Sequence, residues 1–208
     1  GNGGSERINK CERIKIDINN KYELLEKLAF LKIDLIIIGP EIALANGIAD
    51  FLRKKDYKVF GPGKEGAKLE YSKSWAKEFM QEANIPTSKF WKVNSLEEAK
   101  KIIFTSSIQL VVKADGLASG KGVFIPNSKD ECLSAAESIF NGKFGNSGNV
   151  VVLEEKIHGP EVSVFALCDG QRYILLPAAQ DHKRLNEQDK GPNTCLLYTS
   201  DAADDSLG

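Results

Sequence analysis

Residues 109–126, QLVVKADGLASGKGVFIP, set two apolar runs on either side of a glycine-rich turn. The runs at 109–114 and 121–126 predict the two strands of a hairpin. Glycines in such a turn permit positive φ and close backbone approach, so successive N–H groups can point at phosphate oxygens. Lys113 and Lys121, at the ends of the turn, add positive charge. The stretch therefore indicates an anion-binding flap, with a plain flexible hairpin as the alternative.

The turn differs from a Walker A loop in the element that comes after it. A Walker A loop has the form G-x-x-x-x-G-K-[ST] and opens a helix. Here Lys121 and Gly122 enter a predicted strand. A hairpin that folds over phosphates from one side is the better description.

In front of this hairpin, helix and strand patterns alternate. Helical periodicity at 21–32 and 42–55 alternates with apolar runs at 34–39 and 58–60. The apolar stripe expected on the first helix consists of Tyr22, Leu25, Leu28 and Ala29. This β-α-β-α order predicts right-handed crossovers and a doubly wound parallel sheet. We place the end of the first domain at residues 61–63, where glycine and proline follow the last strand.

Beyond residue 63 the order of elements changes. A helix is expected at 63–83, with Ser72 as a cap inside it, and a strand at 90–93. Ser95 and Glu98 have the spacing of a capping box at the start of the next helix. The remaining predicted elements are a helix at 128–141, strands at 149–156, 162–168 and 172–176, and a hairpin turn at Asp169-Gly170.

A second segment with candidate chemistry is VVVLEEKI at 150–157. Its apolar strand ends in the paired carboxylates Glu154 and Glu155. Such a strand end can offer backbone hydrogen bonds to a base and a carboxylate to a ribose. The alternative is an ordinary strand with a solvated acidic end.

A third segment is PAAQDHKR at 177–184, followed by GPNT at 191–194. It gathers a carboxylate, an imidazole, an ammonium and a guanidinium in the four residues from Asp181 to Arg184. A solvated polar loop is the alternative. His182 could act as a general base or serve as a structural histidine.

The segment IGPE at 38–41 follows a predicted strand and opens a helix. Open α/β sheets bind ligands at this carboxyl edge. We therefore count the segment as a further candidate ligand site.

The bulk properties narrow the class of protein. A formal net charge of -1 gives no basic footprint for nucleic acid. The four cysteines form no C-x-x-C pair, so we read them as reduced thiols of a cytoplasmic protein. The apolar run at 35–38 is far too short to span a bilayer, and no signal-peptide pattern opens the chain. Because the chain begins at Gly1 and its only methionine is Met80, we expect it to be processed or truncated.

Taken in order, these segments resemble the phosphoribosylamine–glycine ligase family of the ATP-grasp superfamily. The resemblance also covers FGP at 60–62, SK at 72–73 and EVS at 161–163, and it extends from residue 1 to residue 194. It implies an α/β fold. An N-terminal doubly wound domain at 1–62, lacking its first strand, would precede an incomplete ATP-grasp α+β region at 63–194.

The last residues depart from the family pattern. Family members continue from GPNT with GGMG, whereas this chain reads CLLYTSDAADDSLG at 195–208. That segment has no convincing helix or strand pattern. We expect it to be a non-native tail.

The resemblance also implies a reaction. ATP would phosphorylate the carboxylate of glycine, and the amine of 5-phosphoribosylamine would displace phosphate from glycyl phosphate to give glycinamide ribonucleotide. Mg²⁺ or Mn²⁺ would neutralise charge on the transferred group, with its ligands beyond residue 208, so no metal ligand is assigned and the chain alone is expected to be inactive. Nucleic-acid and membrane partners are not expected. The alternatives are another ATP-grasp ligase or carboxylase, or an ATP-binding module without chemistry.

Site residues are carried over only where the motifs match. The implied catalytic residues are Lys113, Lys183 and Arg184. The residues implied to hold ATP are Lys73 and Lys113 at the phosphates, Gly116, Ser119, Gly120, Lys121 and Gly122 in the flap, Glu154, Glu155, Lys156 and Ile157 at the adenine, Glu161 at the ribose, and Asn193. Gly39, Pro40 and Glu41 would face phosphoribosylamine, and Asp181 and His182 would line the junction of nucleotide and acceptor.

Overall fold

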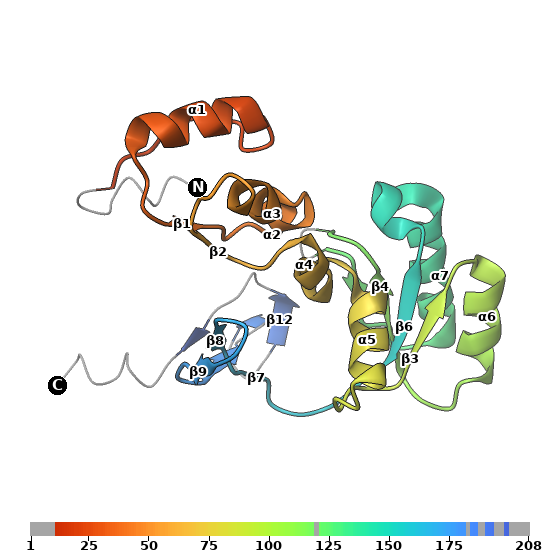
Figure 1. Ribbon diagram of the computed structural model, residues 1–208. Coiled ribbons are helices and arrows are strands. Elements are labelled where there is room, and N and C mark those ends of the chain that lie inside the picture. Colours follow the sequence, from red (N-terminus) through yellow and green to blue (C-terminus); the bar gives the residue numbers. More distant parts are fainter. Residues whose placement is uncertain (1–10, 119–120, 182–183, 187–189, 194–197, 200–208) are drawn as a thin grey trace. The chain divides into compact units, whose positions relative to one another are not determined.

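The computed structural model describes residues 11–118, 121–181, 184–186, 190–193 and 198–199 (Figure 1). The chain divides into two compact units, residues 1–155 and residues 156–208, and each is described by itself. No helix in the described ranges is long and apolar enough to cross a membrane.

The first part of unit 1 has the alternating order expected from the sequence. Its elements are α1 (Lys21–Leu31), β1 (Ile36–Ile37), α2 (Glu41–Ala45), α3 (Ile48–Arg53) and β2 (Val59–Phe60). β1 and β2 pair in parallel, with Ile36 opposite Val59. The helices bury Ala43, Ile48 and Leu52 in a common cluster beside this pair.

The predicted apolar stripe of α1 is wrong in part. Leu24 and Leu28 are the buried residues of the helix, whereas Tyr22 is 88% exposed. At about 100° per residue, Tyr22 lies about 120° around the helix from Leu28, outside the stripe that Leu24 and Leu28 define. Ala29 is exposed for the same reason.

Two predicted helices are each divided in the structure. The helix expected at 42–55 breaks at Gly47, whose φ of 72° is a left-handed conformation that glycine adopts without strain. The helix expected at 63–83 forms α4 (Lys64–Tyr71) and α5 (Lys73–Glu82). Ser72 between them is extended, and its Oγ accepts a hydrogen bond from the Trp75 N–H at 3.3 Å. The prediction of Ser72 as a helix cap is therefore confirmed.

The rest of unit 1 is an antiparallel sheet with the strand order β3-β6-β4-β5. Its strands are β3 (Phe90–Val93), β4 (Leu110–Ala114), β5 (Val123–Phe124) and β6 (Val151–Glu155). The helices α6 (Leu96–Thr105) and α7 (Lys129–Ser138) pack on one face, and α7 continues into a π-helix (Ile139–Lys143) and a 3₁₀-helix (Gly145–Gly148). α5 lies on the other side of the sheet (Figure 1).

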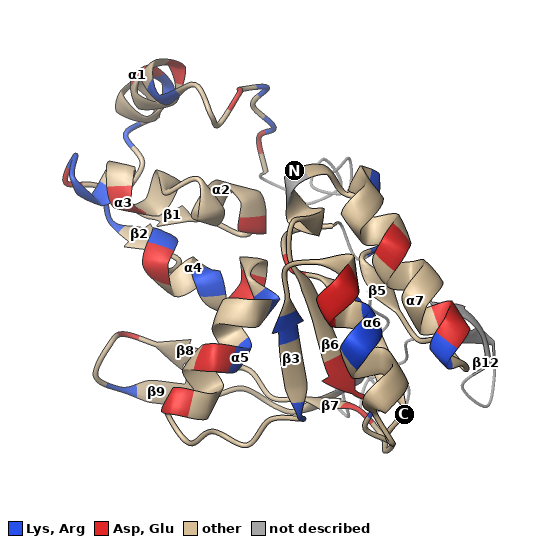
Figure 2. Ribbon diagram, turned by 90° about the vertical axis from the view of Figure 1, so that its right-hand side faces the viewer, with Lys and Arg blue, Asp and Glu red and all other residues tan. Residues whose placement is uncertain are grey.

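The serine half of the capping box expected at Ser95 and Glu98 is present, and the glutamate accepts from the residue before the cap. Ser95 Oγ accepts from the Glu98 N–H at 3.2 Å, and the Glu98 carboxylate accepts from the Asn94 N–H at 2.9 Å. Ser128 and Glu131 repeat the arrangement at α7. Figure 2 shows basic and acidic residues interspersed along α6 and α7, as expected for solvated helix faces.

Unit 2 contains short antiparallel strands. They are β7 (Val162–Ser163), β8 (Ala166–Cys168), β9 (Tyr173–Leu175), β10 (Ala179–Asp181), β11 (Arg184–Asn186), β12 (Lys190–Asn193) and β13 (Tyr198–Thr199). The strand expected at 162–168 is therefore two strands, β7 and β8. The hairpin at Asp169-Gly170 is confirmed, because β8 pairs with β9 and Gly170 has a φ of 95°.

One part of the expected tail has regular structure. β13 pairs with β10, with Asp181 opposite Tyr198. The expectation that residues 195–208 have no strand pattern is thus wrong at residues 198–199, and the other residues of that segment lie outside the described ranges. Side-chain periodicity over two residues is too short to reveal such a strand from sequence.

Candidate functional site

The face of the central sheet opposite α6 and α7 carries charged side chains. Val112, Ala114 and Leu153 point into the core with those helices. Since side chains alternate along a strand, Lys113 on β4 and Glu154 on β6 point to the opposite face. The Lys113 ammonium lies 2.6 Å from Glu154 Oε2, so the two strands are joined there by an ion pair.

A second lysine reaches the same carboxylate from α5. The Lys77 ammonium donates to Glu154 Oε1 at 2.7 Å. It also donates to the hydroxyls of Thr87 and Ser88, each at 2.7 Å. Ser88 in turn donates to Glu154 Oε1 at 2.6 Å. Glu154 is therefore held by two ammonium groups and one hydroxyl.

The surroundings of Glu154 fix its charge. Its side chain is 13% exposed, and burial by itself would raise the pKa of the carboxyl group. Hydrogen bonds from Lys113, Lys77 and Ser88 outweigh that effect and hold the pKa below its ordinary value. The carboxyl group is ionised at neutral pH. The alternative of a solvated acidic strand end is therefore wrong for Glu154.

This lowered pKa predicts a pH dependence of stability. A depressed carboxyl pKa contributes stability above the unfolded-state value of about 4.3, and that stability is lost as pH falls through the folded-state pKa. We expect the difference in free energy of unfolding between wild type and Glu154→Gln to shrink as pH falls from about 7 to about 3. Urea denaturation across that range measures it, with Glu78→Gln as control for an exposed pair. A difference that stays constant with pH would contradict the assignment.

The base of the glycine-rich turn is fixed to the beginning of α5. The backbone N–H groups of Lys73 and Ser74 donate to Asp115, the first to its carbonyl at 3.1 Å and the second to its carboxylate at 2.5 Å. Ser72 Oγ donates to the same carboxylate at 3.1 Å. The Lys73 ammonium donates to the Gly116 carbonyl at 3.2 Å. Burial lowers the pKa of Lys73, while Asp115 opposes that effect.

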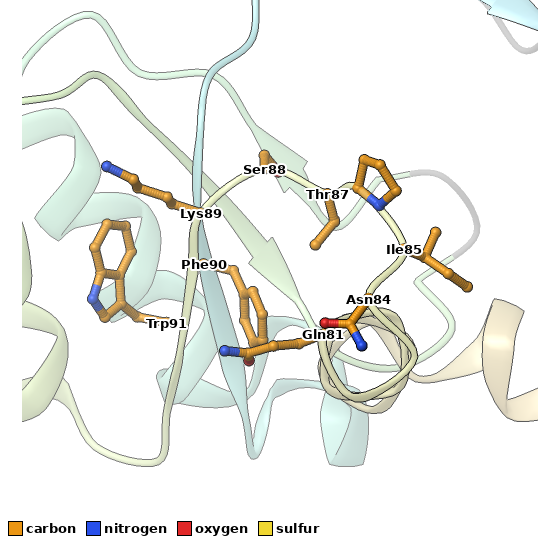
Figure 3. A pocket seen from close by; sticks show the side chains of 9 residues that line it. Gln81, Asn84, Ile85, Thr87, Ser88, Lys89, Phe90 and Trp91 are labelled. Atoms are coloured by element: carbon orange, nitrogen blue, oxygen red, sulfur yellow. The ribbon is translucent and has the colours of Figure 1, made fainter.

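These contacts line a hollow of about 340 Å³ beside the turn. Ser72 and Asp115 contribute polar groups to it, and Leu117 and Val150 contribute apolar surface. A second hollow, of about 570 Å³, lies along the loop that leads from α5 into β3. Figure 3 shows Lys89 and Trp91 on one side of that strand and Phe90 on the other. Thr87 and Ser88, the hydroxyl partners of Lys77, belong to the second hollow.

Gly116 has no room for a side chain. A Cβ there would lie 2.6 Å from Ser147 Oγ and 2.8 Å from Ser147 Cβ. Ser147 is held in place because its Oγ donates to the Leu117 carbonyl at 2.9 Å and its carbonyl accepts from the Gly116 N–H. Glycine is required here by close packing.

We therefore expect Gly116→Ala to lower the free energy of unfolding by about 1–3 kcal/mol through overpacking. Thermal or urea unfolding measures the change. Gly39→Ala is the control, because no atom lies within 4 Å of a Cβ at that position. Ser147→Gly in the Gly116→Ala background should restore part of the loss, and equal stability of Gly116→Ala and Gly39→Ala would contradict this packing.

The other predicted residues of unit 1 that the structure describes lie in three places. Gly39, Pro40 and Glu41 are exposed where β1 leads into α2. Gly122 is buried and its carbonyl accepts from the Ala114 N–H at 2.8 Å, which closes the turn. Glu155 and Lys121 stand at the end of β6 and at the end of the turn. Ser119 and Gly120 lie outside the described residues.

Among the predicted residues of unit 2, the structure brings Arg184 and Asn193 together, because they are opposite each other in the β11–β12 pair. Ile157 and Glu161 are exposed, and Lys156 is half-buried. Asp181, Arg184 and Asn193 lie in β10, β11 and β12. His182 and Lys183 lie outside the described residues. Their roles, like those assigned in unit 1, stay predictions.

Three residues around Glu154 and the glycine-rich turn were not predicted from the sequence. Lys77 and Ser88 hold Glu154, and Asp115 fixes the turn to α5. The one available signal was the spacing of Lys73 and Lys77, which puts both on one face of a helix. Asp115 lay inside the glycine-rich motif without an assigned role.

Comparison with known proteins agrees with this arrangement. The family model described as phosphoribosylglycinamide synthetase, ATP-grasp (A) domain, matches residues 71–197, and the N-domain model of the same family matches residues 1–70. A phosphoribosylamine–glycine ligase from Nostoc sp. is 44% identical over 195 residues, which cover 93% of this chain and 46% of the relative. The chain thus spans about half the length of the curated relatives it matches.

Solved structures of related proteins also resemble this chain. The crystal structure of a phosphoribosylamine–glycine ligase from Thermotoga maritima has a TM-score of 0.68 and 36% identity, and covers 83% of this chain and 42% of the other. The biotin carboxylase domain of 2-oxoglutarate carboxylase from Hydrogenobacter thermophilus has a TM-score of 0.67 at 21% identity and covers 85% of this chain and 41% of the other, which shows the fold alone.

The sheet, the anchored glycine-rich turn and these matches define a protein of the ATP-grasp class. Its α/β fold is the one expected from the sequence. Within that class, the chain belongs to the phosphoribosylglycinamide synthetase family. The domain boundary at 61–63 stays a prediction.

Proposed function

We propose that the full-length protein joins glycine to 5-phosphoribosylamine at the expense of ATP. Glycyl phosphate would be the intermediate, and glycinamide ribonucleotide, ADP and phosphate the products. Family membership supports the reaction. The observation that carries the proposal is the cluster of Lys113, Lys77 and Glu154 on the sheet face opposite α6 and α7, beside the anchored turn.

The ATP phosphates would lie between the turn and the lysines. Lys113 and Lys73 carry positive charge toward this region, and the backbone N–H groups of the turn can add further hydrogen bonds. These groups lie beside the turn before the nucleotide arrives, so they can stabilise charge on a transferred phosphoryl group there. Glu154 to Ile157 would contact the adenine and Glu161 the ribose.

The remaining roles follow the family motifs. Gly39, Pro40 and Glu41 would face phosphoribosylamine. Asp181, His182, Lys183, Arg184 and Asn193 would line the junction where the nucleotide meets the acceptor, with Lys183 and Arg184 acting on the transferred group. Glycine and phosphoribosylamine are the proposed partners, and the cytoplasm the proposed location.

A divalent cation, Mg²⁺ or Mn²⁺, would neutralise charge on the phosphates when bound. The described residues include no group of three or more histidine, cysteine, aspartate or glutamate side chains that could hold one. Mg²⁺ takes oxygen ligands from carboxylates and phosphates. We therefore assign no step of the reaction to a metal held by the described residues.

Phosphate release by the full-length protein tests the proposal. Release is expected to require ATP, glycine and phosphoribosylamine together, and the product is expected to contain an amide. Turnover with bicarbonate or D-alanine in place of glycine would instead indicate another ATP-grasp enzyme. ATP binding without release under all of these conditions would indicate a binding module.

A further inference from the structure

Lys77 is the only buried residue among the described lysines and arginines, at 9% exposed. It lies one helical turn after Lys73 on α5, the helix beside the sheet (Figure 1). Its contact with Glu154 on β6 places its side chain on the side of α5 that faces the sheet. Its ammonium reaches Glu154 Oε1 at 2.7 Å and the hydroxyls of Thr87 and Ser88 at the same distance. The three oxygen partners fix the position of this buried ammonium group.

The two oxygens of Glu154 have different cationic partners. Oε1 accepts from Lys77 and Ser88, and Oε2 accepts from Lys113. Two ammonium charges share one carboxylate charge, so the cluster keeps a net positive charge. The Lys113 side chain is 24% exposed and that of Lys77 is 11% exposed. Lys113 is therefore the more accessible of the two cations to an arriving anion.

The second ammonium changes what happens when Lys113 leaves Glu154. A buried carboxylate that loses its only cationic partner is strongly destabilised. With Lys77 in place, Glu154 keeps one ammonium and one hydroxyl on Oε1 after Lys113 has turned to another anion. Without Lys77, Lys113 would have to remain as the partner of Glu154.

We propose that Lys77 is a positioning residue that neutralises Glu154 and thereby frees the Lys113 ammonium to bind a phosphate oxygen of the nucleotide. This role rests on the proposed ATP-dependent function. Lys77 acts through Glu154 and Lys113 and has no contact with the nucleotide itself.

Nucleotide binding by the full-length Lys77→Met variant tests the role. The Kd and KM for ATP are expected to rise about tenfold or more, because Lys113 stays bound to Glu154. The kcat at saturating ATP is expected to change less than the KM. Lys77→Arg keeps the charge and should restore most of the affinity. Lys92→Met is the matched control, because Lys92 pairs with Glu78 on α5 at 3.0 Å but is more exposed.

The Glu154→Gln background distinguishes a positioning role of Lys77 from a purely structural one. In Glu154→Gln no carboxylate holds Lys113, so adding Lys77→Met should change the ATP Kd by less than about twofold. The same loss of affinity in both backgrounds would overturn the role. If Lys77→Met does not fold, the test depends on Lys77→Arg, which must keep its affinity for ATP. A folded Lys77→Arg variant that has lost this affinity would also overturn the role. If the wild-type protein binds ATP and the Lys77→Met variant binds it equally well, the role of Lys77 alone is overturned. If the wild-type protein does not bind ATP, the proposed function is overturned, and the role of Lys77 with it.

Discussion

Replacing Lys113 by alanine in the full-length protein is expected to lower kcat/KM for ATP by about 10²–10³-fold, the usual effect of removing one charge-stabilising group. Lys113 carries the more accessible ammonium of the Glu154 cluster, and the proposed site aims it at the phosphates. The fold should be retained. Glu154 keeps Lys77 and Ser88 as partners when Lys113 is truncated.

Steady-state titration with ATP measures the effect, and thermal unfolding checks the fold. Lys92→Ala is the control, since it removes a lysine of β3 whose one ion pair among the described contacts is with Glu78. Unchanged ATP kinetics in a folded Lys113→Ala variant would show that the phosphate-binding role has been assigned to the wrong residue.

The largest loss of stability is expected from Glu154→Leu. This change leaves the ammonium groups of Lys77 and Lys113 close together and without their carboxylate. Breaking a buried ion pair by removing one partner costs about 3–5 kcal/mol, because the remaining charge is uncompensated. Urea denaturation at neutral pH measures the free energy of unfolding.

Glu78→Leu is the matched control for that measurement. Glu78 and Lys92 form an ion pair between α5 and β3 whose side chains are 41% and 38% exposed. Exposed pairs contribute about 0–1 kcal/mol. If Glu154→Leu cost no more than Glu78→Leu, the Glu154 cluster would have no special weight in the stability of unit 1.

Local sequence patterns predicted the elements whose signals are local. The strand at 90–93 has the bounds that its pattern indicated, and Ser72, Ser95 and the Asp169-Gly170 turn act as predicted. Each of these depends on residues within four positions of one another. Helical periodicity did not reveal the break at Gly47, because a single glycine is tolerated within a helical pattern.

The charge cluster depends on contacts between distant parts of the chain. Lys77 and Glu154 are 77 positions apart, and no local pattern pairs them. Strand alternation could place Lys113 and Glu154 on one face, but only the packing of α5 on that face brings Lys77 to them. The VVVLEEKI motif at 150–157 showed only that a carboxylate ends an apolar strand. The residues that surround Glu154 come from distant parts of the chain and are known only from the structure.

A crystal structure of the full-length protein with a non-hydrolysable ATP analogue tests the central claim most directly. We expect the phosphates to lie between the glycine-rich turn and Lys113, with Lys113 in hydrogen-bond contact with a phosphate oxygen and Glu154 still paired with Lys77. Phosphates bound elsewhere, with the Lys113–Glu154 ion pair intact, would contradict the account.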